Sequence, residues 1–331
     1  MIIVTGGAGF IGSCLVNQLN KAGYKDIHVV DEFLDEEKWK NLANNTFDTF
    51  THKNKFLSWL KNDSAANKIS HIFHMGACST TTEKNVDFLM ENNFSYSKEL
   101  FSFCIKRNIP FIYASSAATY GLGEKGYSDN EEVIENLKPL NPYGFSKHLF
   151  DKWLLKQEKK PPLWQGFKFF NVYGPNEYHK GSMQSVVAHA VPQILATGKL
   201  KLFKSYKDNI NHGEQKRDFI YVKDVVNVML EQVTSYEKAP ELSKSGIYNL
   251  GTGQARSFVD LGKAVFAALN KTPCFEWVDM PEGLREQYQY FTEADMSKFR
   301  KELSATHQFY TLEDGIYEYV KNFLNKEDPY L

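Results

Sequence analysis

The sequence contains little cysteine, no excess of charge of either sign and no long run of apolar residues. Its 331 residues include four cysteines and no Cys-x-x-Cys pair, so we expect reduced thiols and neither a disulfide framework nor a metal site. The 39 basic and 40 acidic side chains leave a net charge of −1, which argues against a nucleic-acid partner because no basic excess would neutralise phosphates. Since no run of about 18 apolar residues occurs, we expect no membrane-spanning segment. Together these features predict a cytoplasmic protein.

The first half of the chain alternates short apolar runs with amphipathic stretches. Buried strands are expected at Ile2–Thr5, Ile27–Asp31, Ile69–His74, Phe111–Ser115 and Gly166–Phe170. The helices expected between them cover Phe10–Ala22, Asp87–Arg107 and Pro142–Glu158. This alternation predicts an α/β fold with a doubly wound parallel sheet, and the length predicts about two domains at roughly 150 residues each.

The second half is less regular. Its expected elements are strands at Asp218–Val222 and Gly246–Leu250, a helix from Val225 and a helix over Ser257–Leu269. Ser257 is expected to cap the last of these, because a serine oxygen can accept from the first free N–H groups of a helix. Few strand signals occur between Gly174 and Arg217, where Ser205–Lys216 reads as a polar loop. The Lys- and Asn-rich stretch Glu36–Asn67 is expected to be solvated surface.

A glycine-rich motif joins the first expected strand to the first expected helix. The segment G-G-A-G-F-I-G satisfies G-x-G-x-x-G through Gly7, Gly9 and Gly12. Glycines allow the backbone to approach a pyrophosphate, and the free N–H groups at a helix start favour anions. The strand before the motif, the helix after it and Asp31 at the end of the second strand together predict a dinucleotide site.

The charged residues near Asp31 leave the identity of the dinucleotide open. Asp31 could bind a ribose 2′-hydroxyl, which is typical of NAD. Lys38 and Lys53 lie downstream, where either could meet the 2′-phosphate of NADP, although lysines in a Lys-rich stretch are more often solvated. Local chemistry alone therefore does not choose between the two cofactors.

Tyr143 and Lys147 have the spacing of an acid/base pair. At i and i+4 of a helix the two side chains share one face, and an ammonium beside a phenol is expected to lower the pKa of the tyrosine from about 10. Ser116 ends the strand from Phe111, at the sheet edge where open α/β sheets bind ligands. We expect Ser116 to hydrogen-bond a substrate oxygen beside Tyr143, and Lys147 to hold a ribose as well.

Four segments together resemble the extended short-chain dehydrogenase/reductases, which act on nucleotide sugars. They are the glycine motif, S-S-A-A-T-Y-G at 115–121, N-P-Y-G-F-S-K at 141–147 and R-D-F-I-Y-V-K-D-V at 217–225. The resemblance covers essentially the whole chain. It implies a Rossmann domain formed by residues 1–170 and about 218–250. It also implies a smaller α/β substrate-binding domain formed by about 171–217 and 251–331.

Further segments narrow the resemblance to the branch that epimerises ADP-heptoses for lipopolysaccharide core synthesis. The discriminating segment is N-V-Y-G-P-N-E-Y-H-K-G-S-M at 171–183. Dehydratases of the superfamily usually place Asp-Glu after the catalytic hydroxyl, whereas Ala117-Ala118 stands here. The resemblance implies NADP, with NAD possible, an ADP-heptose substrate, redox epimerisation at C6″ with Tyr143 and Lys180 as the two acid/base groups, and self-assembly. Two alternatives stay open: a nucleotide-sugar 4-epimerase or reductase, and a non-catalytic NADP-binding regulatory protein.

The remaining site residues follow from the same resemblance. Cofactor contacts are implied for Gly6, Gly9, Phe10, Ile11, Gly12, Asp31, Glu32, Lys38, Lys53, Met75, Gly76, Ala77, Cys78, Ser79, Asn92, Lys147, Val172 and Lys180. Substrate contacts are implied for Ser116, Asn171, Ser182, His189, Phe203, Arg217 and Tyr288. Taken singly, His189 is more typical of a core histidine. Met75 and Glu32 depart from the family pattern; a carboxylate at Glu32 would repel a 2′-phosphate. The polar loop over 205–216 is expected to be about six residues longer than is usual in the family.

Overall fold

A seven-stranded parallel sheet forms the larger part of the molecule. The computed structural model describes residues 1–33, 37–62, 64–285 and 288–331. The sheet has the strand order β10-β6-β5-β4-β1-β2-β3, and every neighbouring pair is parallel. Its strands are β1 (Ile2–Thr5), β2 (Ile27–Asp31), β3 (Thr49–His52), β4 (His71–His74), β5 (Phe111–Ser116), β6 (Trp164–Phe169) and β10 (Gly246–Leu250). The predicted α/β class with a doubly wound parallel sheet is confirmed.

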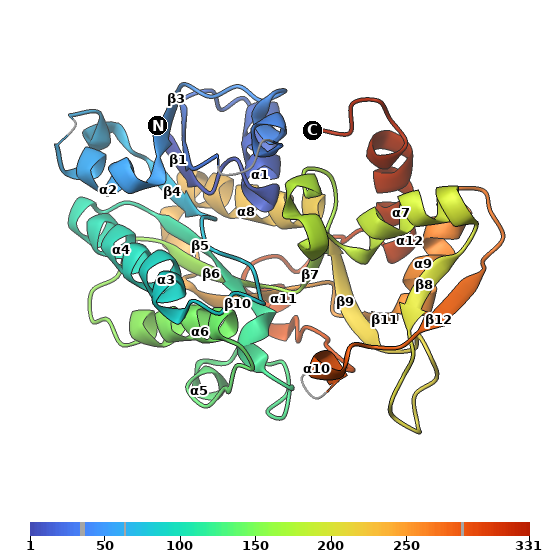
Figure 1. The fold of residues 1–331 in the computed structure, drawn as a ribbon. Helices are drawn as coiled ribbons and strands as arrows, with labels where there is room; N and C mark the ends of the chain where they lie inside the picture. Colours follow the sequence, from blue (N-terminus) through green and yellow to red (C-terminus); the bar gives the residue numbers. More distant parts are fainter. Residues whose placement is uncertain (34–36, 63, 286–287) are drawn as a thin grey trace.

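Helices cover both faces of this sheet, as a fully parallel sheet requires. Figure 1 shows α1 and α8 packed together along one face and α3, α4 and α6 along the other. The helices that accompany the sheet are α1 (Phe10–Lys21), α2 (Lys53–Asn62), α3 (Val86–Leu89), α4 (Tyr96–Arg107), α5 (Glu131–Ile134), α6 (Pro142–Leu155) and α8 (Val222–Lys238). Except for the half-buried edge strand β3, the strands between them are almost entirely buried, which explains their apolar runs.

Two small sheets lie beside the large one. The first has the order β11-β9-β7 and the second pairs β12 with β8. Their strands are β7 (Asn171–Tyr173), β8 (Leu200–Phe203), β9 (Lys216–Tyr221), β11 (Ala255–Ser257) and β12 (Phe275–Val278). The helices on this side are α7 (Val186–Thr197), α9 (Phe258–Ala268), α10 (Glu282–Arg285), α11 (Ser297–Glu302) and α12 (Leu312–Tyr319). Figure 1 shows α7, α9, α12, β8 and β12 gathered at the right. The stretch 218–250, predicted to belong to the Rossmann domain, starts with β9 in a small sheet and ends with β10 in the large sheet. The domain boundaries therefore stay a prediction.

Most predicted elements are present, with shifted ends. Ser257 caps α9 as predicted: its Oγ accepts from the Asp260 N–H at 3.0 Å, and the Asp260 carboxylate accepts from the Ser257 N–H at 3.2 Å. The helix predicted over 87–107 is confirmed as an uninterrupted helical stretch, in which α3 continues through a π-helical segment at Met90–Ser95 into α4. The helix predicted from Val225 begins at Val222.

Most of the described residues in Glu36–Asn67, the stretch predicted to be solvated surface, are exposed or half-buried, and the prediction is wrong for the few that are buried. Within it lie β3 and α2, and the side chains of Phe56 and Leu60 are buried against the core. The polar residues that suggested surface lie on the outer face of α2 and on the edge strand β3. Glu36 and Asp63 lie outside the described residues. The segment between Gly174 and Arg217 also contains more regular structure than predicted, namely α7 and β8.

Within the described part of the chain, no helix combines the length and apolar character needed to cross a lipid bilayer.

Candidate active site

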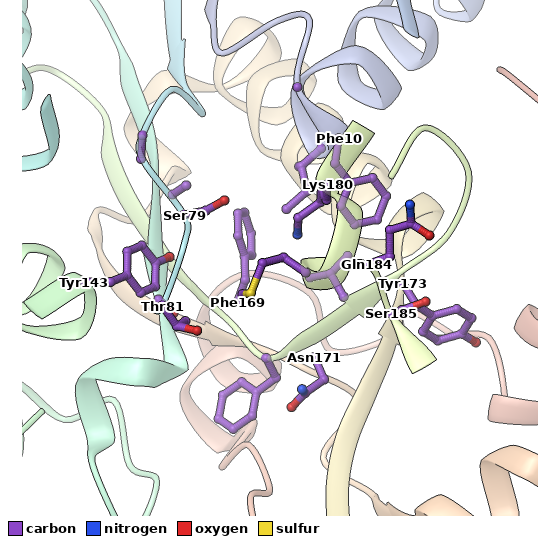
Figure 2. Close-up of a pocket in the computed structure, with 18 of the residues that line it drawn as sticks. Phe10, Ser79, Thr81, Tyr143, Phe169, Asn171, Tyr173, Lys180, Gln184 and Ser185 are labelled. Carbon is purple, nitrogen blue, oxygen red and sulfur yellow. The ribbon is translucent and has the colours of Figure 1, made fainter. Parts of the chain in front are cut away.

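The carboxyl ends of β1, β4, β5 and β6 open into a cavity of about 860 Å³. The opposite side of the cavity is formed by the segment after β7, the start of α7, and strands β8 and β9. Figure 2 shows side chains from both sides pointing into it. Its position agrees with the rule that open α/β sheets bind ligands outside the carboxyl ends of their strands.

The glycine-rich turn at one end of the cavity fits a pyrophosphate. Gly6 has a φ of +67°, and a Cβ there would lie 2.5 Å from the Gly76 backbone nitrogen, so the turn packs backbone to backbone on the loop after β4. A Cβ at Gly12 would lie 2.0 Å from the Gly6 carbonyl oxygen. Among the described residues no side chain caps α1 at Gly9, and no carboxylate lies in its first turn. The positive end of the helix therefore faces the cavity, which favours an anion.

Two carboxylates and two ammonium groups surround the expected ribose position. The Lys38 Nζ lies 2.6 Å from an Asp31 oxygen, and the Lys53 Nζ lies 2.5 Å from a Glu32 oxygen. Lys53 also donates to Asn92 Oδ1 at 3.2 Å. The repulsion expected from Glu32 is thus offset by Lys53, and the four charges sum to zero.

The buried face of α6 presents Tyr143 and Lys147 to the cavity. The helix begins here because Asn141 Oδ1 accepts from the Gly144 N–H at 2.8 Å and Pro142 occupies the first turn. The Lys147 Nζ donates to the Ala114 carbonyl at 2.8 Å. Burial lowers the pKa of Lys147 to about 8.

The pKa of Tyr143 differs from the expectation. Burial raises the pKa of the phenol, while a hydrogen bond with Ser116 acts in the opposite direction. The prediction that Lys147 lowers this pKa is therefore wrong for the structure. The reason is that the phenol is almost fully buried and the Lys147 ammonium is engaged by a carbonyl of β5.

Lys180 approaches the same cavity from the segment that follows β7. It lies in a 3₁₀ turn over Tyr178–Met183, with its Nζ 5.4 Å from the centre of the Phe10 ring. Burial lowers the pKa of Lys180, and the charge of Glu177 acts against that shift. Figure 2 shows Tyr143 and Lys180 entering the cavity from opposite sides. One buried phenol and one partly desolvated amine therefore line the same cavity.

Arg217 supplies a buried cation at another side of the cavity. Its side chain is 7% exposed and lies between the rings of Tyr288 and Phe258, at 5.0 and 5.8 Å from their centres. Its Nη1 donates to the Lys216 carbonyl at 2.9 Å. No carboxylate among the described residues forms an ion pair with it. A guanidinium in this state is well suited to bind phosphate oxygens.

The structure brings nearly all the predicted site residues to the wall of this one cavity. Those that line it are Gly6, Gly9, Phe10, Ile11, Gly12, Asp31, Glu32, Lys38, Lys53, Met75, Gly76, Ala77, Cys78, Ser79, Asn92, Ser116, Tyr143, Lys147, Asn171, Val172, Lys180, Phe203, Arg217 and Tyr288. Ser182 and His189 are not among the lining residues. Ser182 is exposed beside the lining residue Met183, and His189 is exposed on α7, so the reading of a core histidine is also wrong.

Several lining residues were missed by the sequence analysis. They include Thr81, Tyr96, Phe169, Phe170, His179, Gln184 and Gln215. The position of Phe169 and Phe170 at the carboxyl end of β6 is a signal that would have found them. Gln215 sits at the end of the long polar loop, and only the packing of that loop against β8 brings it to the site.

Comparisons with known proteins agree with this geometry. Residues 2–251 match the NAD dependent epimerase/dehydratase family. The chain is 50% identical to the ADP-L-glycero-D-manno-heptose-6-epimerase of Fusobacterium nucleatum subsp. nucleatum and 47% identical to that of Nitratidesulfovibrio vulgaris, over 100% of both chains in each case. The crystal structure of the Helicobacter pylori ADP-L-glycero-D-manno-heptose-6-epimerase superposes with a TM-score of 0.75 at 28% identity, covering 97% of this chain and 95% of that one.

The family match supports a nicotinamide cofactor in the glycine-rich half of the cavity, where the uncapped start of α1 fits its pyrophosphate. The full-length relatives place the chain within one group of nucleotide-sugar enzymes. The chain belongs to the NAD dependent epimerase/dehydratase family and, within it, to the ADP-L-glycero-D-manno-heptose-6-epimerases.

Proposed function

We propose that the chain interconverts ADP-D-glycero-β-D-manno-heptose and ADP-L-glycero-β-D-manno-heptose by redox epimerisation at C6″. The observation that carries the proposal is the entry of Tyr143 and Lys180 into one cavity from opposite sides, beside a turn that fits a dinucleotide. The names of its full-length relatives support the same substrate. Since the two epimers point their C6″ hydroxyl in different directions, one acid/base group for each direction is expected.

The chemistry explains why a cofactor is needed. The C6″ hydrogen is not next to a carbonyl, so removing it as a proton would be very unfavourable. When bound, the nicotinamide would accept that hydrogen as hydride and return it to the other face, so that the sugar passes through a 6″-ketone and no net oxidation results.

The residues of the chain then move one proton in each half of the reaction. As one epimer is oxidised, Tyr143 takes the C6″ hydroxyl proton, and protonated Lys180 gives a proton to the C6″ oxygen when the ketone is reduced to the other epimer. In the opposite direction Lys180 takes the proton and Tyr143 gives it. The Ser116 hydroxyl, which is hydrogen-bonded to the Tyr143 phenol, also orients the sugar oxygen beside that phenol. Arg217 holds the diphosphate of the substrate, which fixes the sugar between the two groups.

The direct test follows C6″ in a mixture of the purified protein, NADP and one ADP-heptose epimer by NMR. Both epimers should form, and deuterium on the reactive carbon of the reduced nicotinamide should appear at C6″ of the sugar. Entry of solvent deuterium at C6″ would contradict hydride transfer. No interconversion by protein with demonstrably bound cofactor would favour a regulatory role.

A variant at Lys180 separates this proposal from the alternative of a nucleotide-sugar 4-epimerase or reductase. Lys180→Ala should remove most interconversion of the ADP-heptoses, by about 10²-fold or more for the loss of a general base. Lys201→Ala, which removes a lysine of the same cavity from β8, is the matched control and should lose less. Equal activity of Lys180→Ala and wild type would contradict the assigned role.

NADP is the proposed cofactor, with NAD also accepted. The support is Lys53, which is paired with Glu32 and can turn its ammonium to a 2′-phosphate, and Lys38, which sits beside Asp31. Lys53→Met should weaken NADP binding about tenfold or more and leave NAD binding nearly unchanged, because one charge-assisted hydrogen bond is worth about 1.5–3 kcal/mol. Glu32→Gln should shift the ratio of dissociation constants toward NADP. The reverse effects would contradict the proposal.

Two properties of the whole protein are also proposed. We propose a homo-oligomer, supported by Phe88 of α3 and Phe145 of α6, which are 39% and 45% exposed on two helices in contact with each other. Light scattering of the purified protein measures its mass, and a monomer would contradict this. We also propose a cytoplasmic location, consistent with four free thiols. Fractionation of the source cells tests it.

A further inference from the structure

Glu177 is a buried carboxylate in the same segment that carries Lys180. Its side chain is 1% exposed. It accepts hydrogen bonds from the Ser185 N–H at 2.5 Å, the Ser185 hydroxyl at 2.7 Å, the Tyr319 hydroxyl at 3.0 Å and the Gly174 N–H at 3.2 Å. All four donors are neutral. Burial raises the pKa of Glu177, while the hydrogen bonds from Ser185 and Gly174 and the charge of Lys180 act in the opposite direction and favour the ionised carboxylate.

The four donors show what this carboxylate does for the backbone. Gly174 follows β7, and Ser185 is the residue that caps α7. One side chain therefore joins the two ends of the segment 174–185, which we call the Lys180 segment, while Tyr319 links it to α12. Within the segment the Lys180 N–H donates to the Glu177 carbonyl at 3.0 Å. Glu177 thus holds the backbone segment that carries the Lys180 side chain as a closed loop.

We propose that Glu177 is a positioning residue for Lys180, closing the Lys180 segment and keeping a negative charge beside the ammonium. This inference rests on the proposed function, in which Lys180 accepts the C6″ hydroxyl proton of one epimer. The mechanism above gives Glu177 no contact with substrate or cofactor, and it does not line the cavity. Its effect therefore passes through residues of the Lys180 segment that do line the cavity, Lys180 among them.

The charges around Glu177 make Lys180 the group that responds to it. The other titratable groups that face this carboxylate are Cys14 of α1, Tyr178 of the Lys180 segment and Tyr319 of α12. Burial raises the pKa of all three, so they stay neutral near neutral pH. Among the described residues no lysine or arginine forms an ion pair with Glu177. Lys223, whose charge acts on Cys14, is paired with Glu318.

His179 is the remaining titratable ring on the Lys180 segment. Its Nδ1 lies 3.1 Å from the Asn41 Nδ2. Because His179 also lines the cavity, a His179→Asn variant measured alongside shows how much of any pH profile comes from this ring and not from Lys180.

The experiment measures the first appearance of reduced nicotinamide when NADP-loaded protein is mixed with each epimer separately. Oxidation of one epimer depends on Tyr143 and oxidation of the other on Lys180. A Lys180 base must be neutral, and Glu177 opposes the burial that lowers the pKa of Lys180. Glu177→Gln removes the negative charge at nearly constant shape, so the pKa of Lys180 should fall further. The acidic limb of the pH–rate profile for the Lys180-dependent oxidation should therefore move to lower pH. The Tyr143-dependent oxidation should keep its profile.

Two further variants separate charge from geometry. Glu177→Asp keeps the charge but cannot reach all four donors, so the Lys180-dependent rate should fall by up to about 10²-fold, the scale of a small misplacement, with the limb unmoved. Tyr319→Phe removes one donor from α12 and should also leave the limb in place. Because Glu177→Asp retains a carboxylate, it keeps the test usable where Glu177→Gln does not fold.

The outcomes distinguish this inference from the function on which it rests. A Lys180→Ala variant that oxidises both epimers normally would overturn the role of Lys180 itself. A Lys180→Ala variant that fails with one epimer, together with an unmoved limb in Glu177→Gln or equal effects of Glu177→Asp on both epimers, would overturn the inference alone.

Discussion

The two sides of the cavity hold Tyr143 and Lys180, the two proposed acid/base groups, in different ways. We call the side formed by β5 and α6 the Tyr143 wall. Behind it, Lys168 and Asp151 form an ion pair at 2.6 Å with both side chains 0% exposed. Asp151 also accepts from the hydroxyls of Tyr113 at 2.8 Å and Ser115 at 2.7 Å. This network links two strands to the helix that carries Tyr143, next to Ser116.

The Lys180 segment has no such frame of regular structure. Its 3₁₀ turn contains Gly181 with φ +53° and ψ −124°, and distant parts of the chain support it. The Tyr178 hydroxyl donates to the Pro329 carbonyl at 2.9 Å, and the Leu331 N–H donates to Asn176 Oδ1 at 3.0 Å. Tyr143 is thus held by the regular structure of the fold, whereas Lys180 depends on a few side-chain contacts.

The largest expected effect tests whether the two sides act separately. Tyr143→Phe should slow oxidation of one ADP-heptose epimer by about 10²–10⁴-fold, the usual contribution of a general acid/base. The other epimer should still be oxidised through Lys180, so reduced nicotinamide should accumulate from it. Rapid mixing with each epimer measures both rates. An equal loss of rate with both epimers would show that the two sides of the cavity do not act separately.

The next prediction concerns the stability of the Tyr143 wall. Asp151→Ala should lower the free energy of unfolding by about 3–5 kcal/mol, because it leaves the Lys168 ammonium buried without its partner. The double variant Asp151→Leu, Lys168→Met should lose less, since no charge stays buried. Urea denaturation measures both.

An exposed ion pair provides the control for that prediction. The Lys156 Nζ lies 3.3 Å from Glu135 Oε1, and the Lys156 side chain is 66% exposed. Lys156→Met should therefore change the free energy of unfolding by about 1 kcal/mol or less. An Asp151→Ala loss as small as this would show that the buried pair does not stabilise the wall.

A third prediction separates binding from proton transfer on the side that carries Lys180. Arg217→Lys keeps the charge but loses the planar fork that binds phosphate oxygens. The KM for ADP-heptose should rise about tenfold or more, on the scale of a charge-assisted hydrogen bond, with a smaller change in kcat. Steady-state kinetics measure both constants. A fall in kcat at constant KM would instead connect Arg217 with the reacting atoms.

The smallest expected effect concerns the backbone of the Lys180 segment. In Gly181→Ala the added Cβ has no atom within 4 Å, but the backbone at this position must keep a positive φ. For alanine this costs a strain of about 1–3 kcal/mol. Relief of that strain should shift the turn and slow only the Lys180-dependent oxidation. Gly126→Ala, also at positive φ with open space, is the control. The same loss of rate in both variants would contradict a local effect.

The parallel sheet and its glycine turn were readable from the sequence because their causes are local. Buried strands such as Ile2–Thr5 are short continuous apolar runs, and a glycine motif between strand and helix has few other uses. Edge strand β3, T-F-T-H, was missed because it is half-buried and polar, so it lacks that signal.

The site was partly predictable for a similar reason. Tyr143 and Lys147 share a helix face by spacing alone, whereas Lys180 was assigned through the family resemblance. His189, also assigned through that resemblance, is exposed on α7 and is not among the lining residues of the cavity, so its assignment stays a prediction. The clamp of Glu177 on Gly174, Ser185 and Tyr319 has no sequence pattern, since Tyr319 is 142 residues away.

By itself the sequence determined the parallel α/β sheet, the anion-binding turn and the pairing of Tyr143 with Lys147, because each follows from periodicity or spacing over a few residues. Only the tertiary structure decided that Lys53 neutralises Glu32, that burial raises the pKa of Tyr143, and that Glu177 closes the segment beneath Lys180. These properties depend on desolvation and on contacts between distant residues, which arise only when the chain has packed.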